Sequence, residues 1–430
     1  MSRYKAYPEY KDSGVDWIKD IPSNWQVKRI SYIASLRSGD AIVAEQIEVE
    51  GDFPVYGGNG LRGYTANYNH EGEFILIGRQ GALCGNVNYG AGKFWASEHA
   101  VVVHPYLAIV TKWFGETLRA MNLNQYNVSA AQPGLAVANI TCLKVPFPSL
   151  EEQQKIANFL DHETAKIDTL IAKQQELIKL LKEKRQAVIS HAVTKGLNPN
   201  APMRDSGVEW LGEVPAHWMV FNMDHALRAI GDVDHYMPAS IDIGVPYVMT
   251  GDLKEVVSGI NFDACKQVSR SDYLALSKKI RGEKGDVIMA RYATVGTVSY
   301  IDIDAEFIVS YSCVTIKPKT DKVIGLYLFY YFKSDAFLQG IQSQVNTNTQ
   351  GNVGINDLKK IKVALPTLSE QSEIVDCLQR TIRDFDLISE KAKEAIVLAQ
   401  ERRTALISAA VTGKIDVRDW QPPSESAIAA

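Results

Sequence analysis

Apolar residues recur at alternating intervals of three and four along two long stretches, at about residues 163–193 and again 218 positions later. This spacing places them on one face of a helix and, sustained over several turns, is typical of a coiled coil. The predicted seam positions are Ile167, Leu170, Gln174, Leu177, Leu181, Lys184 and Val188, and then Phe385, Ile388, Ala392, Ala395, Ala399, Arg402 and Leu406. Large residues in one seam correspond to alanines in the other, so the pattern predicts two helices that pair closely. The alternative is that each helix packs on its own neighbouring domain.

Helix-start signals precede both stretches. Ser149 is a good N-cap, and Glu152 three residues later completes a capping-box pattern. Thr367 and Glu370 repeat this arrangement. A second helical start is expected near residues 161–164, and from there to the end of the stretch the helix would run roughly 45 Å.

The rest of the chain forms two bodies, at about residues 26–147 and 219–365, that mix strand and helix patterns. β-Branched and aromatic runs such as EFILIG, AVVVHP, DVIMAR and FIVSYSCVTIKP predict strands bounded by Gly-rich turns. The segments YLAIVTKWFGETLRAMN and VIGLYLFYYFKSDAFLQGI predict helices. Each body is therefore predicted to be a small α/β domain.

Three phrases of the sequence occur twice. The start box, DSGVDWIKDIPSNW at residues 12–25, returns as DSGVEWLGEVPAHW at residues 205–218, which is an offset of 193. PSLEEQQKIANFL and RQAVISHAVT return as PTLSEQSEIVDCL and RTALISAAVT at an offset of 218. The second copy therefore holds 25 extra residues, between Trp218 and Gln350. The chain is a duplicated frame around bodies that have diverged.

The start boxes have the residues of a structural joint. Asp12, Ser13 and Gly14 suit a turn, and Trp17 and Trp25, with their copies Trp210 and Trp218, are apolar anchors. We interpret the boxes as closing the ends of the helix pair into a pseudo-twofold frame. The alternative is that each box forms a local core for its own body.

These patterns predict an α/β (α+β) chain with an internal repeat. Two mixed α/β domains are separated by two long helices. The predicted division is 1–149 for the first start box and domain, 150–197 for the first helix region, 198–367 for the second start box and domain, 368–414 for the second helix region, and 415–430 for a tail.

Composition indicates a soluble globular protein. Hydrophobic residues make up 46% of the 430 residues and charged residues 22%. No apolar run approaches a membrane span and the N-terminus lacks a signal-peptide pattern, so we expect a cytoplasmic protein. The cysteines have neither paired nor metal-binding spacing and are expected to be small buried residues: Cys84, Cys142, Cys265, Cys313 and Cys377.

Catalytic motifs are not evident. The Gly-rich YGGNGLRGYT lacks the Lys-hydroxyl ending of a phosphate loop, and neither a GxSxG elbow nor an HExxH pair occurs. Dispersed histidines give no metal site, and the carboxylates form no spacing that demands acid and base chemistry. A recognition protein fits these observations better than an enzyme.

The chain resembles the DNA-specificity (S) subunit of type I restriction-modification enzymes. The resemblance is carried by the duplicated start box and by the duplicated phrases PSLEEQQKIANFL and RQAVISHAVT. The resemblance covers the whole chain in order. It implies two target-recognition domains, each reading one half of a split, asymmetric DNA site, and an antiparallel pair of spacer helices. A spacer of roughly 45 Å slightly exceeds one turn of DNA, about 34–36 Å.

The resemblance also implies partners. It implies two modification subunits, which methylate adenine with S-adenosylmethionine, and two restriction subunits, which use ATP and Mg²⁺. These cofactors would belong to the partners, and this chain would have no cofactor, metal or catalytic residue of its own.

Charge gives no overall sign of DNA binding. The net charge is −4, residues 26–149 hold 9 basic and 9 acidic residues, and residues 219–367 hold 16 of each. Phosphate attraction must then come from the partners or from local patches such as KKIRGEK (278–284) and KKIK (359–362), which also suit plain solvated faces.

Base reading requires Arg, Lys, Asn or Gln side chains that can reach groove edges from well-held loops. Arg79 and Arg291 each follow a predicted strand at matched points of the two bodies. The predicted DNA-contacting residues are Asn59, Arg62, Tyr64, Arg79, Gln80, Gln132, Lys278, Lys279, Arg281, Arg291, Tyr292, Asn346, Asn348 and Gln350. The rival hypotheses are a non-DNA coiled-coil scaffold for a protein assembly and a cryptic nuclease or methyltransferase.

Overall fold

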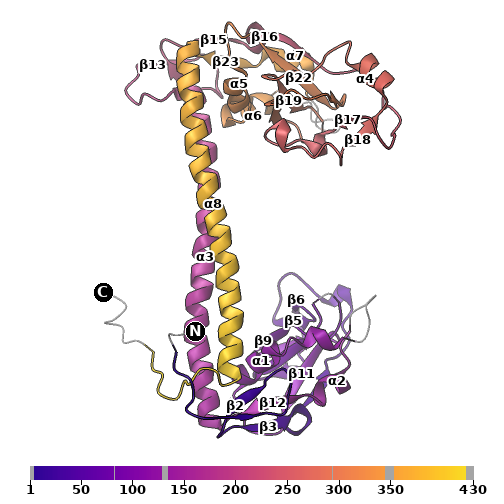
Figure 1. The fold of residues 1–430 in the computed structure, drawn as a ribbon, viewed down its shortest axis with the longest axis vertical. Coiled ribbons are helices and arrows are strands. Elements are labelled where there is room, and N and C mark those ends of the chain that lie inside the picture. The colour runs from indigo at the N-terminus through magenta and orange to yellow at the C-terminus, as the bar shows by residue number, and fades with distance from the viewer. Residues whose placement is uncertain (1–3, 82, 128–133, 293, 344–352, 423–430) are drawn as a thin grey trace. The chain divides into compact units, whose positions relative to one another are not determined.

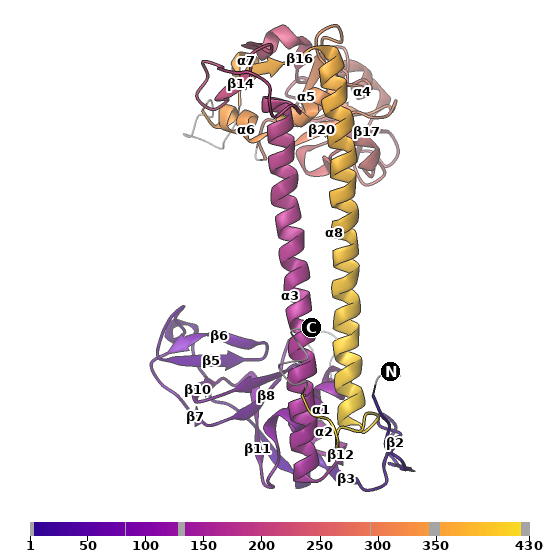
Figure 2. The ribbon, with the colours of Figure 1, turned by 90° about the vertical axis from the view of Figure 1, so that its left-hand side faces the viewer.

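The computed structural model describes residues 4–81, 83–127, 134–292, 294–343 and 353–422. The chain forms two compact units (Figures 1 and 2). Unit 1 comprises Met1–Gln175 and Lys393–Ala430, and unit 2 comprises Glu176–Ala392. Each unit holds one start box, one body and a part of each long helix. The duplication seen in the sequence is therefore a duplication of units.

Short strands make up most of the body of unit 1. They are β1 (Tyr10–Asp12), β2 (Asp20–Pro22), β3 (Gln26–Arg29), β4 (Ala34–Ser38), β5 (Phe53–Gly57), β6 (Gly60–Thr65), β7 (His70–Glu71), β8 (Phe74–Gly78), β9 (Val87–Gly90), β10 (Lys93–Ala96), β11 (Ala100–Pro105) and β12 (Lys144–Phe147). An antiparallel sheet has the order β4-β11-β8-β9, and a second sheet, β6-β5-β10-β7, contains the parallel pair of β5 and β10. β12 pairs with β3, and β1 pairs with β2 inside the start box. The helices are α1 (Thr111–Ala120) and α2 (Val137–Thr141), with 3-10 turns at Ile30–Tyr32, Ala44–Gln46 and Leu123–Tyr126.

The body of unit 2 is built in the same way. Its strands are β13 (Met203–Asp205), β14 (Glu213–Pro215), β15 (Met219–Asn222), β16 (Leu227–Gly231), β17 (Val245–Val248), β18 (Lys266–Val268), β19 (Val287–Ala290), β20 (Val298–Tyr300), β21 (Ile308–Val309), β22 (Cys313–Pro318) and β23 (Lys362–Leu365). Its sheets have the orders β16-β22-β19-β20 and β18-β17-β21, with β13 on β14 and β15 on β23. The helices are α4 (Arg270–Leu276), α5 (Gly325–Phe332), α6 (Asp335–Gln342) and α7 (Ile355–Lys360), with 3-10 turns at Met223–Ala226, Thr250–Asp252 and Val257–Gly259.

The two bodies share one topology although their sequences differ. The sheet β4-β11-β8-β9 corresponds to β16-β22-β19-β20, and the parallel pair of β5 and β10 corresponds to β17 and β21. The predicted strands are present as β8, β11, β19, β21 and β22, and the predicted helices as α1, α5 and α6. The expectation of two small mixed α/β domains in a repeated chain is confirmed.

The long helices α3 (Leu150–Lys195) and α8 (Leu368–Val411) are both continuous. The predicted second start near residues 161–164 is therefore wrong. The Thr164 hydroxyl donates to the carbonyl oxygen of Leu160 at 2.6 Å, so this polar side chain bonds within the helix and does not end it. In unit 1 the first part of α3 lies beside the last part of α8, and in unit 2 the last part of α3 lies beside the first part of α8 (Figures 1 and 2).

The seam of α3 agrees with the prediction at every second position, and the seam of α8 agrees at five of its seven positions. The positions that are buried or partly buried as predicted are Ile167, Gln174, Leu181, Val188, Phe385, Ala392, Ala395, Ala399 and Leu406. Between them, the predicted Leu170, Leu177, Lys184, Ile388 and Arg402 are exposed. The residue that follows each of these five is partly buried instead: Ile171, Ile178, Arg185, Ser389 and Arg403. Two spacings fit the sequence of α3, because Leu170 is followed by Ile171 and Leu177 by Ile178. Packing selects the spacing that turns the isoleucines inward and leaves Leu170 and Leu177 exposed.

One ion pair occurs in both units at the 218-residue offset. In unit 1, Arg403 donates to Asp168 at 2.8 Å, and in unit 2 the corresponding Arg185 lies 3.8 Å from Asp386. Each pair joins α3 to α8 inside its own unit. The two units therefore hold the helix pair in the same antiparallel register.

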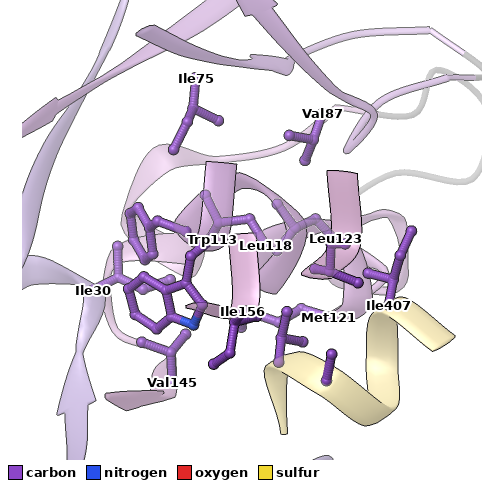
Figure 3. Close-up of a cluster of buried hydrophobic side chains, with 14 of the residues drawn as sticks. Ile30, Ile75, Val87, Trp113, Leu118, Met121, Leu123, Val145, Ile156 and Ile407 are labelled. Atoms are coloured by element: carbon purple, nitrogen blue, oxygen red, sulfur yellow. The ribbon is translucent and has the colours of Figure 1, made fainter. Parts of the chain in front are cut away.

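The core of unit 1 includes both long helices as well as the body. Ile156 of α3 and Ile407 of α8 lie with Trp113 and Met121 in one cluster of buried side chains (Figure 3). Trp113 and Ile156 are 0% exposed. In unit 2, residues of both long helices join the body core in the same way. The alternative in which each helix packs only on its own neighbouring body is therefore wrong.

The start boxes attach to the ends of the long helices. Trp25 packs in the core of unit 1, where Gly413, which ends α8 with a positive φ of 77°, leaves room for Pro22 and the indole. In unit 2, Trp218 packs in the core and lies against Gly196, which ends α3 with a φ of 76°. These contacts support a frame that closes on the helix ends, rather than an isolated local core for each body.

The glutamate of each predicted capping box binds the start box. Glu152 accepts hydrogen bonds from the Asn24 amide of the start box at 3.4 Å and from the Tyr7 hydroxyl, just before the box, at 2.6 Å. Glu370 accepts one from the Trp218 indole at 3.0 Å. The backbone N–H groups of these glutamates donate to Ser149 and Thr367, so the N-caps are confirmed. The reciprocal half of the capping box is wrong, because the carboxylates point to the start boxes.

The glutamine after each glutamate binds the body. The buried Gln153 accepts from the N–H of Val110, which precedes α1, at 3.1 Å. Gln371 accepts from Ile324, which precedes α5, at 2.8 Å. The repeated Glu-Gln pair thus joins the start of each long helix to both other parts of its unit.

The cysteines are free thiols, and three are buried as expected. Cys142 is exposed and Cys377 is only partly buried, so the expectation of burial is wrong for Cys142, which directly follows the short helix α2. Within the described ranges, no helix is both long enough and apolar enough to span a bilayer.

Candidate nucleic-acid interface

Arg79 and Arg291 occupy equivalent backbone positions in the two bodies. Arg79 directly follows β8; its N–H donates to His99 at 2.9 Å and its carbonyl oxygen accepts from Leu135 at 2.9 Å. Arg291 directly follows β19; its N–H donates to Ser312 at 2.9 Å and its carbonyl oxygen accepts from Val353 at 3.3 Å. Leu135 and Val353 are themselves related by the 218-residue offset. The backbone that holds each arginine has therefore been kept through the duplication.

The side chains of these two arginines have different surroundings. The half-buried guanidinium of Arg79 donates to the Ser38 hydroxyl at 3.2 Å. The guanidinium of Arg291 is buried and donates to the Asp232 carboxylate at 2.6 Å and to the carbonyl oxygen of Val353 at 3.4 Å. Arg79 thus has a neutral partner, whereas the charge of Arg291 is compensated inside unit 2.

In unit 1 the structure brings three of the predicted residues together. Gly78 and Gly58 are in backbone contact, because a side chain on Gly78 would collide with the carbonyl oxygen of Gly58. This contact sets the β5–β6 turn, with the exposed Asn59, against the chain that carries Arg79 and the exposed Gln80. Glycine is required at such a close approach of two backbones.

Two more predicted residues lie on β6. The exposed Arg62 runs its side chain over Gly57 of the neighbouring strand. Tyr64 is partly buried further along β6, and its main chain pairs with Glu48. Arg62 can therefore approach a ligand at the β5–β6 turn, whereas Tyr64 is set back from it along the strand.

In unit 2, Asp232 joins two of the predicted residues. Besides Arg291, it accepts from the amino group of the exposed Lys279 at 3.2 Å, and the His235 ring nitrogen lies 3.3 Å away. Tyr292 is half-buried, with the Arg291 guanidinium 5.2 Å from its ring centre. Lys278 is exposed next to Lys279.

Arg281 is not part of this cluster. It lines a separate open pocket of about 250 Å³ whose other charged residues are Glu283, Lys284, Asp304 and Glu306. The pocket has more carboxylates than cations, so it does not resemble a phosphate site. The remaining predicted residues Gln132, Asn346, Asn348 and Gln350 lie outside the described residues.

The electrostatics of Asp232 follow from its neighbours Lys279, Arg291 and His235. Burial alone would raise the pKa of this carboxyl, but hydrogen bonds from Lys279 and His235 and the charge of Arg291 outweigh burial and lower the pKa. Asp232 is therefore ionised at neutral pH. In the part of the chain that the structure describes, no group of His, Cys, Asp or Glu could hold a metal ion.

Sequence reasoning missed Asp232, although a signal was present. Gly39-Asp40 directly follows β4, and Gly231-Asp232 stands at the end of β16, the corresponding strand. Pro54 and Pro246 lie at the same 192-residue offset. The two aspartates have different partners. Asp40 is exposed and accepts from Asn69 at 2.9 Å, whereas Asp232 is 8% exposed and bonded to Arg291.

Two mixed α/β bodies, each fixed by its own start box to an antiparallel helix pair, define a class of internally duplicated recognition proteins. A family model described as "Type I restriction modification DNA specificity domain" matches residues 22–180 and 240–397. The chain belongs to this family. It is therefore a DNA-sequence recognition subunit of the type I restriction-modification class and not a catalytic subunit.

Curated relatives agree with this assignment. The chain is 45% identical over 172 residues to the type I restriction enzyme EcoprrI specificity subunit of Escherichia coli, a match that covers 39% of this chain and 42% of that protein. It is 24% identical over 364 residues to a putative type I restriction enzyme specificity subunit of Haemophilus influenzae, covering 84% of this chain and 87% of the relative.

The fold also matches a solved structure. A chain from a structure that concerns complex assembly and conformational transition of the type I R-M system aligns with a TM-score of 0.67 and 15% identity. The alignment covers 92% of this chain and 99% of that chain. At this identity the match supports the fold, including both bodies and the long helices.

Proposed function

We propose that the chain reads a bipartite, asymmetric DNA site, with one half-site contacted by each body. The observation that supports this proposal is the matched backbone around Arg79 and Arg291, on which the side chains differ. The backbone around the two arginines is repeated, whereas the partners of their side chains differ. This arrangement suits two domains that recognise different DNA sequences. In this proposal, residues 1–149 and 198–367 are the reading domains, 150–197 and 368–414 are the helix regions, and 415–430 is a tail.

The reading surface proposed for unit 1 is the β5–β6 turn with the strand end beside it. Asn59, Arg62 and Gln80 are exposed there, and the Arg79 guanidinium donates to the neutral Ser38 hydroxyl. Arg suits the acceptor edge of guanine, and Asn or Gln suits the edge of adenine. Tyr64 is assigned a supporting role at the margin of this surface, and Gln132, which lies outside the described residues, stays a predicted contact.

The reading surface proposed for unit 2 is centred on the chain after α4. Lys278 and Lys279 are exposed there and can reach phosphate or base acceptors. Tyr292 offers an aromatic face. Arg281 stays a candidate contact, as do Asn346, Asn348 and Gln350, which lie outside the described residues. Arg291 is assigned a bracing role, because a buried guanidinium already bonded to Asp232 is not available to a base.

The helix pair is proposed to set the spacer and to dock the catalytic partners. The exposed leucines of the long helices are apolar surface of the kind that partner helices cover: Leu170, Leu177, Leu180, Leu387 and Leu398. The proposed partners are DNA, two modification subunits with S-adenosylmethionine and two restriction subunits with ATP and Mg²⁺, in the cytoplasm. Because the bodies carry balanced charge, these partners would supply much of the phosphate attraction.

Selection from random duplex DNA tests this proposal. The full chain, co-expressed with the methyltransferase subunit of its own genome, is expected to enrich two short base blocks separated by a gap of fixed length. Arg79→Ala should relax bases in one block only, and Tyr32→Ala, an exposed residue outside the surface, serves as the matched control. Enrichment of one uninterrupted block, or of no sequence, would contradict the proposal.

A further inference from the structure

Asp232 is a buried carboxylate at a junction of unit 2. It directly follows β16, and it contacts Lys279 after α4 and Arg291 after β19. These two cations belong to separate segments that carry candidate DNA contacts. A single side chain thus fixes the relative positions of two parts of the proposed reading surface.

Arg291 extends this connection to a third part of the chain. Its guanidinium donates to the carbonyl oxygen of Val353, and its own carbonyl oxygen accepts from the N–H of Val353. Val353 is 1% exposed and belongs to the core of unit 2. The hydrogen bonds therefore run from Asp232 through Arg291 to Val353, and the residues at both ends of this series are buried.

The corresponding residues of unit 1 lack this connection. Asp40 is exposed and bonded to Asn69, while Arg79 is bonded to Ser38. The same two residue types, at matched places, are paired in one unit and separate in the other. Maintenance of the fold alone does not require the pair, because unit 1 has the same topology without it.

We propose that Asp232 is a positioning residue for base recognition by unit 2, holding Lys279 and Arg291 in the geometry that one half-site requires. This inference rests on the proposed function, since it assigns a means of specificity to one of the two readers. The carboxylate acts through the two cations and does not itself contact DNA. Charge-assisted hydrogen bonds of this kind fix geometry more strongly than neutral ones.

The test compares Asp232→Asn with the matched control Asp40→Asn in the full chain with its methyltransferase subunit. The readout is competition binding to duplexes with single-base changes in each half-site, together with the salt dependence of binding. Asp232→Asn should lower base discrimination at one half-site by about tenfold, the scale of one good side-chain contact to a base. Discrimination at the other half-site and the salt slope should stay as in wild type. Asp40→Asn should leave both half-sites unchanged.

A second variant separates positioning from stability. Asp232→Asn combined with Arg291→Gln removes both buried charges, so the body should stay folded as judged by its melting temperature. It should still lose discrimination at one half-site. Full discrimination in either folded variant, or equal loss at both half-sites, would overturn the role of Asp232. A wild-type complex without any base preference would instead overturn the proposed function, and with it this inference.

Discussion

Unit 1 and unit 2 hold an arginine at the same point of the same sheet, yet they use it differently. Arg79 is half-buried and bonded to a serine, whereas Arg291 is buried and bonded to an aspartate. The backbone bonds on both sides of each arginine are the same. The duplication has therefore preserved the backbone around each arginine. The partners of the arginine side chains determine which of the two guanidinium groups is available to a ligand.

Changing the frame on which both units depend should have the largest effect. The proposed variant has seven residues inserted in α3 between Gln175 and Glu176, and seven inserted in α8 between Ala395 and Ile396. The two insertions lie opposite each other in the register that is given by the ion pair of Asp168 and Arg403. They lengthen the helix pair by about 10 Å, or roughly three base pairs of DNA. The matched insertion should move the preferred gap between half-sites by that amount, measured by selection on random DNA.

An insertion in α3 alone is the control for this experiment. It breaks the register and should weaken recognition of the whole site, without producing a new preferred gap. An unaltered gap after the matched insertion would show that the helices do not set the spacing.

The two arginines should differ in their contribution to stability. Arg291→Ala removes the shortest hydrogen bond of the buried Asp232 carboxylate, 2.6 Å, and should lower the free energy of unfolding by about 3 kcal/mol. Arg79→Ala removes a part-exposed neutral hydrogen bond and should cost about 1 kcal/mol or less. Chemical denaturation of the full chain measures both values. Equal losses would mean that the difference in burial has no energetic consequence.

The start-box tryptophans give a smaller contrast. Trp218 donates to Glu370, whereas the buried indole N–H of Trp25 has no hydrogen-bond partner among the described residues. Trp218→Phe should therefore cost about 1.5–3 kcal/mol more than Trp25→Phe, the value of a hydrogen bond to a charged group. Thermal melts of the two variants test this, since the loss of ring area is the same in both.

The repeated ion pair should give the smallest difference. Among the described residues Arg403 binds Asp168, whereas Arg185 binds Glu255 as well as Asp386, with contacts to Glu255 of 2.8 and 3.0 Å. Exposed ion pairs contribute about 1 kcal/mol or less, so Arg403→Ala should be nearly neutral and Arg185→Ala should cost up to about 1 kcal/mol more. Both losses should shrink in high salt, and a larger loss for Arg403→Ala would contradict the assignment.

The sequence predicted the duplicated frame because its determinants are local. The Glu-Gln phrase, the paired tryptophans and the strand runs need only the spacing of residues, and each appears in the structure where the spacing predicts it. The seam of α3 was predicted correctly only in alternate positions, because Leu170-Ile171 and Leu177-Ile178 offer two apolar faces. Only packing against the other helix selects between them.

The candidate site was less accessible to sequence reasoning. Arg291 has the strand-end position of a reader, but its burial depends on Asp232, which lies 59 residues earlier. Such a pairing is set by tertiary structure, and balanced charge counts in both bodies gave no signal for it. The repeated Gly-Asp dipeptide would have indicated a matched position, although not whether the aspartate is paired.

Methylation mapping of cells that carry the wild-type chain and its methyltransferase subunit tests the central claim most directly. We expect methylated adenines in a motif of two base blocks separated by a gap of constant length. Arg79→Ala should relax one block and leave the other intact. A single continuous motif, or relaxation of both blocks by Arg79→Ala, would contradict the claim that two separate readers share one duplicated frame.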